Sequence, residues 1–576
     1  MIPTPGQNYS PGVKLCCAKG RTLRNGMGCG ILTEKGGIVM KSIRFRVIAL
    51  ILSMALLLGG CGVLDFSGYF DKLADMFGPV SFDNMEYTRP DLSGLDGALE
   101  ACLESAADGK DLDRLVGDIT TLNSICSAFQ TNYLLAFIHY SIDMSDTYWE
   151  TEYNYCAQQG TKVQAAVDEL MYALAECSLR GQLEAEEYFG EGYFDDYDGE
   201  SLWTEAFTAL MEQETELVNS YYELSAQALL MDPTSEEFFT TCGAQLQALY
   251  VQMVKLRQQI AAEAGYGSYP EFAYEFYFDR DYTPEQAATY LADIRRELVP
   301  LYEQLYLLDV WDEVYEPCDE GQTYRFVERM AAAMGGTVRE AFELMDSSGL
   351  YHISYEENKY DSSFEVFLPD YMVPFVFVNP TKTGQDKLTF AHEFGHFCSD
   401  YASAGIERNI DVAEFFSQGM EYLSLFYVDG TEDLKALKLA DSLCVYVEQA
   451  ALADFENRVY RMDTDALTVE SVQELYGQIA DEYGFGDAAD SRSYVNIPHL
   501  FTSPMYVISY VVSNDAAMQL YQMESEKAGS GLDCYRGQLA VQHNDFLTFV
   551  KWAQLTSPFE PGHVKEMKSV FEELFQ

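Results

Sequence analysis

The segment His392-Glu393-Phe394-Gly395-His396 places two imidazoles and a carboxylate at a spacing that suits metal chemistry. On a helix, residues four positions apart lie one above the other, so both imidazoles can reach one ion. Glu393 then projects beside that ion without ligating it. A Zn²⁺ ion with three protein ligands keeps one position open for water, and an adjacent carboxylate can take a proton from that water. The pattern predicts a zinc site with Glu393 as general base and amide hydrolysis as its chemistry.

A second acidic segment, residues 411–423, supplies candidates for the third ligand. Glu414 follows His396 by 18 positions, which leaves room for a loop and a returning helix, so we expect Glu414 to be that ligand. Glu421 lies on nearly the same helix face and is either the rival ligand or a partner that orients a ligating histidine. We also expect Asp411 to support the site without binding the metal. The alternative is that Asp411 and Glu414 form a capping box, which would leave Glu414 structural.

The elements that must position these residues can be predicted from the surrounding pattern. Residues 373–379 are typical of a buried strand, residues 380–386 of a polar turn, and residues 387–399 of the helix that carries both histidines. Residues 365–368 also favour a strand. The two strands either leave an open edge beside the metal, where a peptide substrate can pair as an added strand, or form an ordinary buried hairpin.

These motifs together resemble the M3 metallopeptidases, the group of thimet oligopeptidase and oligoendopeptidase F. The resemblance rests on the histidine motif followed by Glu414-Phe-Phe-Ser-Gln-Gly-Met-Glu421. Residues 264–285 are similar to the helical region upstream of the site in that family, and residues 497–510 are similar to its segment of histidine and tyrosines. The resemblance is specific over residues 240–576, and the N-terminal part shares only a general helical character.

The resemblance implies a role for each matched residue. Glu393 is the base, and Tyr510 polarises the substrate carbonyl, where a preorganised donor stabilises the developing negative charge. The implied cofactor is one Zn²⁺ ion per chain. The implied zinc ligands are His392, His396 and Glu414, and the residues implied to face the substrate are His499, Tyr506 and Tyr510.

The rest of the chain predicts a mainly α fold. Apolar residues recur at helical spacing in residues 95–138, 161–183, 202–230, 235–264 and 284–308. With the resemblance, this predicts a two-lobed helical metallopeptidase with a deep substrate channel and a small β-sheet beside the zinc helix. We expect residues 93–345 to form the helical lobe and residues 346–576 the zinc catalytic lobe.

The N-terminal region has the pattern of an export signal. Residues 40–46 are basic, and residues 47–58 are an apolar run too short to span a bilayer of about 30 Å. The sequence Leu58-Gly-Gly-Cys61 then resembles a bacterial lipobox. We expect residues 40–60 to be a signal peptide, Cys61 to be lipidated, residues 61–92 to be a tether, and residues 1–39 to precede the true start. The alternative is a chance cysteine after an apolar run.

Composition excludes some partners. The chain has 36 Lys and Arg against 92 Asp and Glu, a net charge of −56, so nucleic acid is not an expected partner. Without residues 1–60 the balance is 28 against 91, a net charge of −63. The nine cysteines beyond Cys61 show no C-x-x-C pairs, so no disulfide framework is expected.

These observations predict a zinc-dependent oligopeptidase that hydrolyses internal bonds of short peptides. We expect it to be extracytoplasmic and anchored to the bacterial cell membrane by the lipid on Cys61. A cell-surface lipoprotein that binds peptides and has a non-catalytic zinc site is the alternative. A purely structural surface lipoprotein, without stoichiometric metal, is the third hypothesis. An intact Glu393 favours the enzyme, because a binding protein does not require a general base.

Overall fold

The computed structural model describes residues 80–575, apart from residues 186–188, 190–192, 195–196, 198–203, 229–230, 306–315, 361, 407, 487–489, 540 and 542–544. The upstream extension, the signal peptide, Cys61 and most of the tether predicted from the sequence lie outside the described residues. The described part is mainly helical, with one small sheet, as the sequence predicts.

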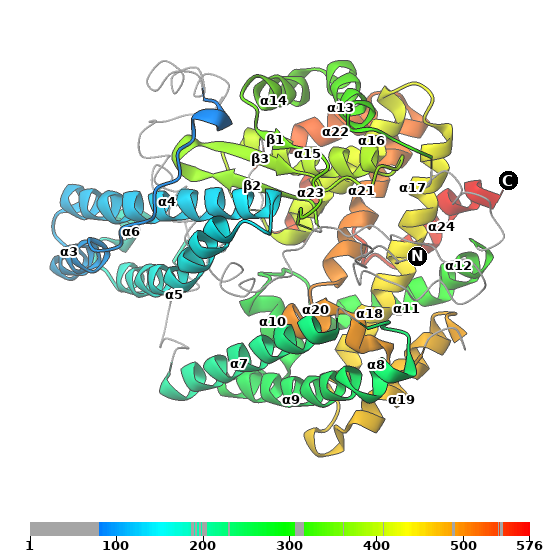
Figure 1. Cartoon of the computed structure of the whole chain (residues 1–576), viewed down its shortest axis with the longest axis horizontal. Helices are drawn as coiled ribbons and strands as arrows, with labels where there is room; N and C mark the ends of the chain where they lie inside the picture. The colour runs from blue at the N-terminus through cyan, green and yellow to red at the C-terminus, as the bar shows by residue number, and fades with distance from the viewer. Residues whose placement is uncertain are drawn as a thin grey trace, which may run out of the picture.

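The N-terminal helices form an arm on one side of the molecule, blue to cyan in Figure 1. The sequence pattern over residues 95–138 predicts one continuous helical stretch, but two helices form, because Gly109 adopts a left-handed φ of 58° and ends the first. The Asp111 side chain then caps the start of the second helix. The arm consists of α3 (Leu95–Asp108), α4 (Leu112–Ile142), α5 (Thr147–Ala175) and α6 (Arg180–Leu183).

The next helices also show breaks that periodicity did not reveal. Thr241 interrupts the stretch predicted over residues 235–264, and Pro300, which has no N–H to donate, marks a fresh helical start within residues 284–305. The helices here are α7 (Glu205–Ala228), α8 (Glu236–Thr240), α9 (Cys242–Glu263), α10 (Tyr269–Phe276), α11 (Pro284–Glu297) and α12 (Val299–Leu305).

The sheet has three strands in the order β1-β3-β2. Strand β3 pairs in parallel with β1 and antiparallel with β2, with Phe364 opposite Phe377 and Leu368 opposite Val373. The two strands predicted from the sequence therefore form a hairpin, and β2 lies at an edge of the sheet. The strands are β1 (Tyr351–His352), β2 (Phe364–Leu368) and β3 (Val373–Phe377).

Helix α15 (Asp386–Ser403), which carries both histidines of the motif, packs against β2 and β3 and against α16 (Ile410–Tyr427). Helix α16 in turn packs against α21 (Ile508–Glu526). Helices α13 (Glu320–Met334) and α14 (Gly336–Ser347) pack against α15 as well. Helix α15 is therefore enclosed on several sides, which restricts the directions of its side chains.

The remaining C-terminal helices complete the described part of the chain. Helix α17 continues through a π-helical turn at Val445–Gln449 into α18. The bounds are α17 (Glu432–Cys444), α18 (Ala450–Val459), α19 (Val469–Glu482), α20 (Pro498–Thr502), α22 (Ser530–Leu539), α23 (Phe546–Trp552) and α24 (His563–Phe571).

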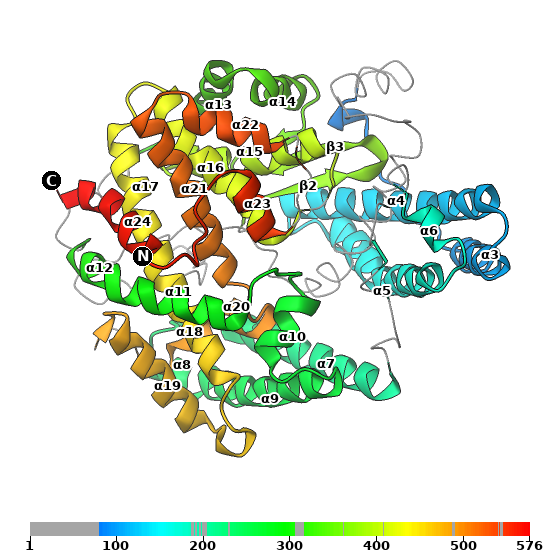
Figure 2. The ribbon, with the colours of Figure 1, turned by 180° about the vertical axis from the view of Figure 1, so that it is seen from behind.

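Figures 1 and 2 show two groups of helices, one with the sheet and α13 to α16, the other with α7 to α10 and α18 to α20. The second group combines elements from before and after residue 345, because α19 packs on α9 and α20 on α7. The boundary at residue 345 stays a prediction from sequence. The buried apolar residues form one continuous core cluster through both groups.

Two further features of the described residues bear on the sequence predictions. The nine cysteines in the described part of the chain form no disulfide with one another. No helix in the described part of the chain is both long and apolar enough to cross a bilayer.

Candidate active site

Helices α15 and α16 approach each other closely at Gly395. A Cβ atom at this position would lie 2.5 Å from the Phe416 carbonyl oxygen and 2.7 Å from the Ser417 Cα atom. A larger residue would push α15 away from α16, because these distances are shorter than van der Waals contact. Gly395 therefore brings the two histidines within reach of the carboxylates on the neighbouring helix.

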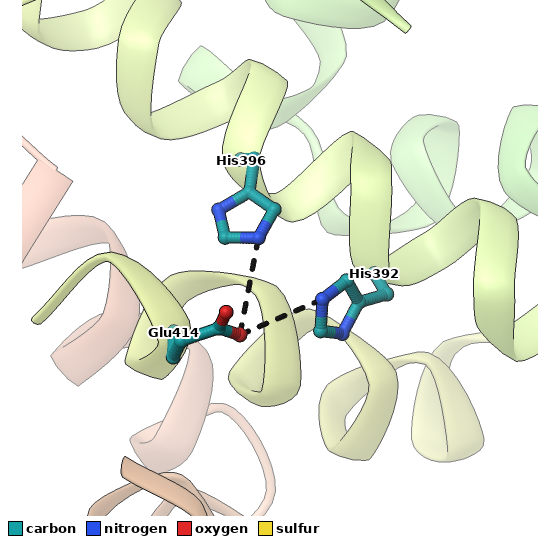
Figure 3. Close-up of side chains that lie close together, drawn as sticks. All are labelled: His392, His396 and Glu414. Carbon is teal, nitrogen blue, oxygen red and sulfur yellow. Dashed lines mark ion pairs between the residues drawn. The ribbon is translucent and has the colours of Figure 1, made fainter. Parts of the chain in front are cut away.

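The residues predicted as zinc ligands lie together (Figure 3). His392 Nε2 is 3.6 Å from Glu414 Oε2, and His396 Nε2 is 3.9 Å from the same oxygen. One ligand atom from each of the three residues lies within 4.8 Å of the others. Within the described part of the chain, this is the one cluster of histidine, cysteine and acidic side chains with a spacing suited to a metal ion.

Glu421 orients His392 rather than joining the ligand cluster. Its Oε1 atom lies 2.8 Å from His392 Nδ1, which leaves Nε2 directed at Glu414. Lys438 of α17 forms an ion pair with the other oxygen of Glu421 at 2.9 Å. This is the arrangement expected of a carboxylate that fixes the tautomer of a ligating histidine.

Glu393 is buried beside this cluster. Burial raises the pKa of Glu393 to about 8, with His392 opposing the rise and the carboxylates of Glu414 and Glu421 adding to it. A divalent cation in the same cluster would favour the ionised form. The geometry thus places a carboxyl group next to the candidate ligands. Its raised pKa suits a group that accepts and returns a proton near neutral pH.

Asp411 does not form a capping box with Glu414. Helix α16 is capped by Asn409, whose side chain accepts a hydrogen bond from the Asp411 N–H. The Asp411 carboxylate accepts a hydrogen bond from Tyr282 at 2.8 Å and pairs with Arg280 at 3.5 Å. Glu414 is therefore not held in a capping box at the helix start, and Asp411 connects α16 to the segment before α11.

The predicted substrate-facing residues gather next to Glu414. The ring centroids of Tyr506 and Tyr510 are 5.2 Å apart, and the His499 ring lies 5.8 Å and 6.1 Å from them. The Tyr506 hydroxyl lies 3.5 Å from Glu414 Oε1. Residues nearly a hundred positions downstream of Glu414 thus belong to the same site.

Two buried arginines hold this downstream segment in place. Arg257 of α9 donates to the carbonyl oxygens of Leu500 and Phe501, and its charge is met by Glu214 at 2.6 Å. Arg280 donates to the Met505 carbonyl at 2.9 Å and to Ser509 Oγ at 2.8 Å. These arginines fix the path of the chain that carries His499 and both tyrosines.

Sequence reasoning did not single out the side chains that support the ligands. Ser417 donates to Glu414 Oε2 at 3.0 Å, Lys438 pairs with Glu421, and Arg257 and Arg280 hold the downstream segment. Ser417 and Arg280 do lie in the segments that carry the family resemblance. Lys438 has no signal of its own, because α17 carries two lysines, Lys435 and Lys438, and the sequence does not show that Lys438 is the buried one.

The donor set fits zinc. Two imidazole nitrogens and one carboxylate oxygen form a common set of protein ligands for catalytic zinc, which leaves a coordination position for water. His392 already has its Nδ1 atom engaged by Glu421, so its Nε2 is the atom available for a metal. His392, His396 and Glu414 are the residues that would hold the ion.

Residues 82–201 match the family model described as the peptidase M3 N-terminal domain. A comparison with curated proteins by sequence gives no match.

Several solved structures are similar to most of the chain. A putative oligoendopeptidase F shares 21% sequence identity with a TM-score of 0.74, covering 86% of this chain and 99% of that one. PZ peptidase A with an inhibitor gives 21% identity and a TM-score of 0.73 over 86% and 99% of the two chains. A putative oligoendopeptidase F from Bacillus anthracis str. Ames shares 21% sequence identity with a TM-score of 0.70, covering 86% of this chain and 98% of that one.

The fold is thus that of the oligoendopeptidase F-type structures, and residues 82–201 match the N-terminal domain of the M3 peptidases. Both findings confirm the resemblance to the M3 group that the motifs predicted. These comparisons do not bear on the metal or on the roles of individual side chains.

Proposed function

We propose that this protein is a zinc-dependent oligopeptidase that hydrolyses internal bonds of short peptides. The observation that carries the proposal is the cluster of His392, His396 and Glu414, with the buried Glu393 on the same helix as the two histidines. The likeness of the fold to oligoendopeptidase F-type structures supports the same class of reaction. When bound, Zn²⁺ would polarise the scissile carbonyl and lower the pKa of a water molecule.

Glu393 is proposed to move the proton in this reaction. As a carboxylate it takes a proton from the attacking water, and as a carboxylic acid it returns that proton to the leaving amine. Its burial keeps bulk water away, so the proton stays within the site. Glu421 supports the step indirectly, because it holds His392 in the orientation in which Nε2 faces Glu414.

Tyr510, Tyr506 and His499 are proposed to face the substrate. A hydroxyl or imidazole donor near the scissile bond stabilises the negative charge that develops on the carbonyl oxygen. Tyr510 is our candidate for that donor, and the contact of Tyr506 with Glu414 places the group beside the ligand cluster. The edge of strand β2 is proposed to pair with the peptide backbone, which would tolerate many sequences.

Location is a separate proposal that rests on sequence alone. We propose that the mature protein starts at Cys61 and is held outside the cytoplasmic membrane by a lipid on that thiol. Expression in bacteria with a radiolabelled fatty acid tests this directly. Label on the wild-type chain and none on Cys61→Ser would support it, and equal labelling of both would contradict it.

The experiment that tests the activity uses a mixed library of short peptides and the chain that begins after Cys61. Cleavage products are identified by mass spectrometry with no additive, with a chelator, and after zinc is restored. We expect internal cleavage that disappears with the chelator and returns with zinc. Tight zinc binding without cleavage would instead favour a surface lipoprotein that binds peptides, and absence of stoichiometric zinc would favour a structural one.

A further inference from the structure

A line of three buried polar groups runs from helix α17 to the zinc helix. Lys438 Nζ lies 2.9 Å from Glu421 Oε2, and Glu421 Oε1 lies 2.8 Å from His392 Nδ1. The side chains of Lys438 and Glu421 are each 3% exposed, so solvent does not screen the pair. The line ends at His392 Nε2, which faces Glu414 at 3.6 Å.

Lys438 is the cation in a strongly acidic part of the core. Glu393, Glu414 and Glu421 all lie within this buried region, and Asp441 follows Lys438 by one helical turn. The ammonium group also lies over the ring of Tyr422, 4.8 Å from its centroid. A buried carboxylate without such a partner is strongly unfavourable, so the position of Glu421 depends on Lys438.

We propose that Lys438 is a positioning residue for the zinc ligand His392 and acts through Glu421. Its ammonium group holds the Glu421 carboxylate in the place where that carboxylate fixes the ring of His392. The inference rests on the proposed function, because it assumes that His392 binds zinc. It adds a residue from α17 to the support of a ligand cluster whose members lie on α15 and α16.

The direction of the change in zinc affinity distinguishes positioning by Lys438 from a purely electrostatic effect of its charge. A positive charge near a metal site repels a divalent cation, so removing the charge alone would make zinc bind more tightly. Removing a group that positions a ligand would make zinc bind more weakly. Loss of a residue that supports a ligand from outside typically weakens metal binding by about 10- to 100-fold.

The experiment measures the zinc dissociation constant of the full chain after Cys61, by competition with a chromophoric chelator. We expect Lys438→Met, which keeps most of the side-chain volume, to weaken zinc binding by about 10- to 100-fold. Lys438→Arg keeps the charge and should restore most of the affinity. Asp441→Asn is the matched control, because it changes another neighbour of Lys438 on the same helix and should leave the affinity near that of the wild type.

A double-variant comparison tests whether Lys438 acts through Glu421. In a Glu421→Gln background there is no carboxylate for Lys438 to hold, so adding Lys438→Met should change zinc affinity by less than about threefold. If Lys438→Met does not fold, Lys438→Gln replaces it in the same comparison. Additive effects of the two changes would overturn the proposal.

Two further readouts separate the possible outcomes. The visible spectrum of the Co²⁺-loaded protein should change with Lys438→Met and not with Asp441→Asn, because only the first alters the orientation of a ligand. Unchanged or tighter zinc binding by a folded Lys438→Met variant would overturn the positioning role. Failure of the wild-type chain to bind zinc would instead overturn the proposed function.

Discussion

Gly395 lies where helices α15 and α16 approach each other closely. Alanine normally stabilises a helix interior relative to glycine by about 0.5–1 kcal/mol. At Gly395, however, a Cβ would lie 2.5 Å from a backbone oxygen of α16. We therefore expect Gly395→Ala to lower the free energy of unfolding by about 1–3 kcal/mol and to weaken zinc binding.

The matched control is Gly117→Ala in α4, where a Cβ would meet nothing within 4 Å. We expect that change to raise the free energy of unfolding slightly. Denaturant unfolding of both variants checks the prediction. Stabilisation by Gly395→Ala would show that the two helices do not approach as closely as described.

Tyr510 is expected to act in the chemical step rather than in binding. Replacing it by phenylalanine removes one hydroxyl and keeps the ring, so packing against Tyr506 should persist. Loss of one donor to a developing oxyanion typically lowers kcat by about 10²- to 10³-fold. We expect such a loss for Tyr510→Phe, with KM changed far less.

Steady-state kinetics on one cleaved peptide checks this. Tyr521→Phe on the same helix is the control, because that ring packs against Tyr422 and Phe426. An unchanged kcat for Tyr510→Phe would mean that another donor, such as His499 or Tyr506, meets the carbonyl.

At the scale of elements, helix α24 is joined to α21 by a buried histidine. His563 Nε2 lies 2.6 Å from Asp515 Oδ1, and the other oxygen of Asp515 accepts hydrogen bonds from Tyr290 and Tyr446. Burial lowers the pKa of His563, but the Asp515 carboxylate outweighs this effect, so the pKa lies above its ordinary value of 6.5.

The sign of the pH dependence follows from that shift. A histidine whose pKa is raised by folding contributes stability that is complete below the ordinary pKa and is lost as pH rises through the folded pKa. We therefore expect the difference in free energy of unfolding between wild type and His563→Gln to be largest at about pH 5.5 and smaller at about pH 8.5. Denaturant unfolding at both pH values measures it, and a difference that grows with pH would contradict the account.

The sequence predicts some elements well because their signals are local. The strands around residues 365–368 and 373–379 and the helix over residues 387–399 appear nearly as expected, since hydrophobic runs and polar turns mark their ends. The sequence does not reveal the break at Gly109, because apolar spacing continues across it. The sequence also permits a capping box at Glu414, and only the structure shows that Asn409 caps α16.

The sequence predicts those residues of the candidate site that belong to a recognisable motif. His392, Glu393, His396 and Glu414 follow from spacing and resemblance, and the structure brings the three proposed ligands together. Arg257 could not be predicted, because its contacts join residues more than 240 positions apart. Lys438 could not be predicted either, because nothing in the local sequence shows that its helix packs beside Glu421.

At the scale of the whole molecule, net charge opposes compactness. The chain carries a formal net charge of −56, and like charges on one surface repel. Raising the ionic strength from about 0.01 M to about 0.1 M shortens the Debye length from about 30 Å to about 10 Å. We expect the midpoint of thermal unfolding to rise over this range.

The comparison of sodium chloride with tetramethylammonium chloride at equal ionic strength separates screening from specific cation binding. A similar rise with both salts is the expected result. A midpoint that falls with both salts would show that attractive ion pairs, such as that of Arg458 with Glu482, outweigh the net repulsion.

The central claim is that a metal held by His392, His396 and Glu414 acts together with Glu393 to hydrolyse peptides. The most direct measurement determines bound zinc and peptide turnover in the same preparations of wild type and Glu393→Gln. We expect one zinc ion per chain in both, and a fall in turnover of about 10²- to 10⁴-fold in the variant. A zinc-loaded Glu393→Gln variant that retains wild-type turnover would contradict the claim.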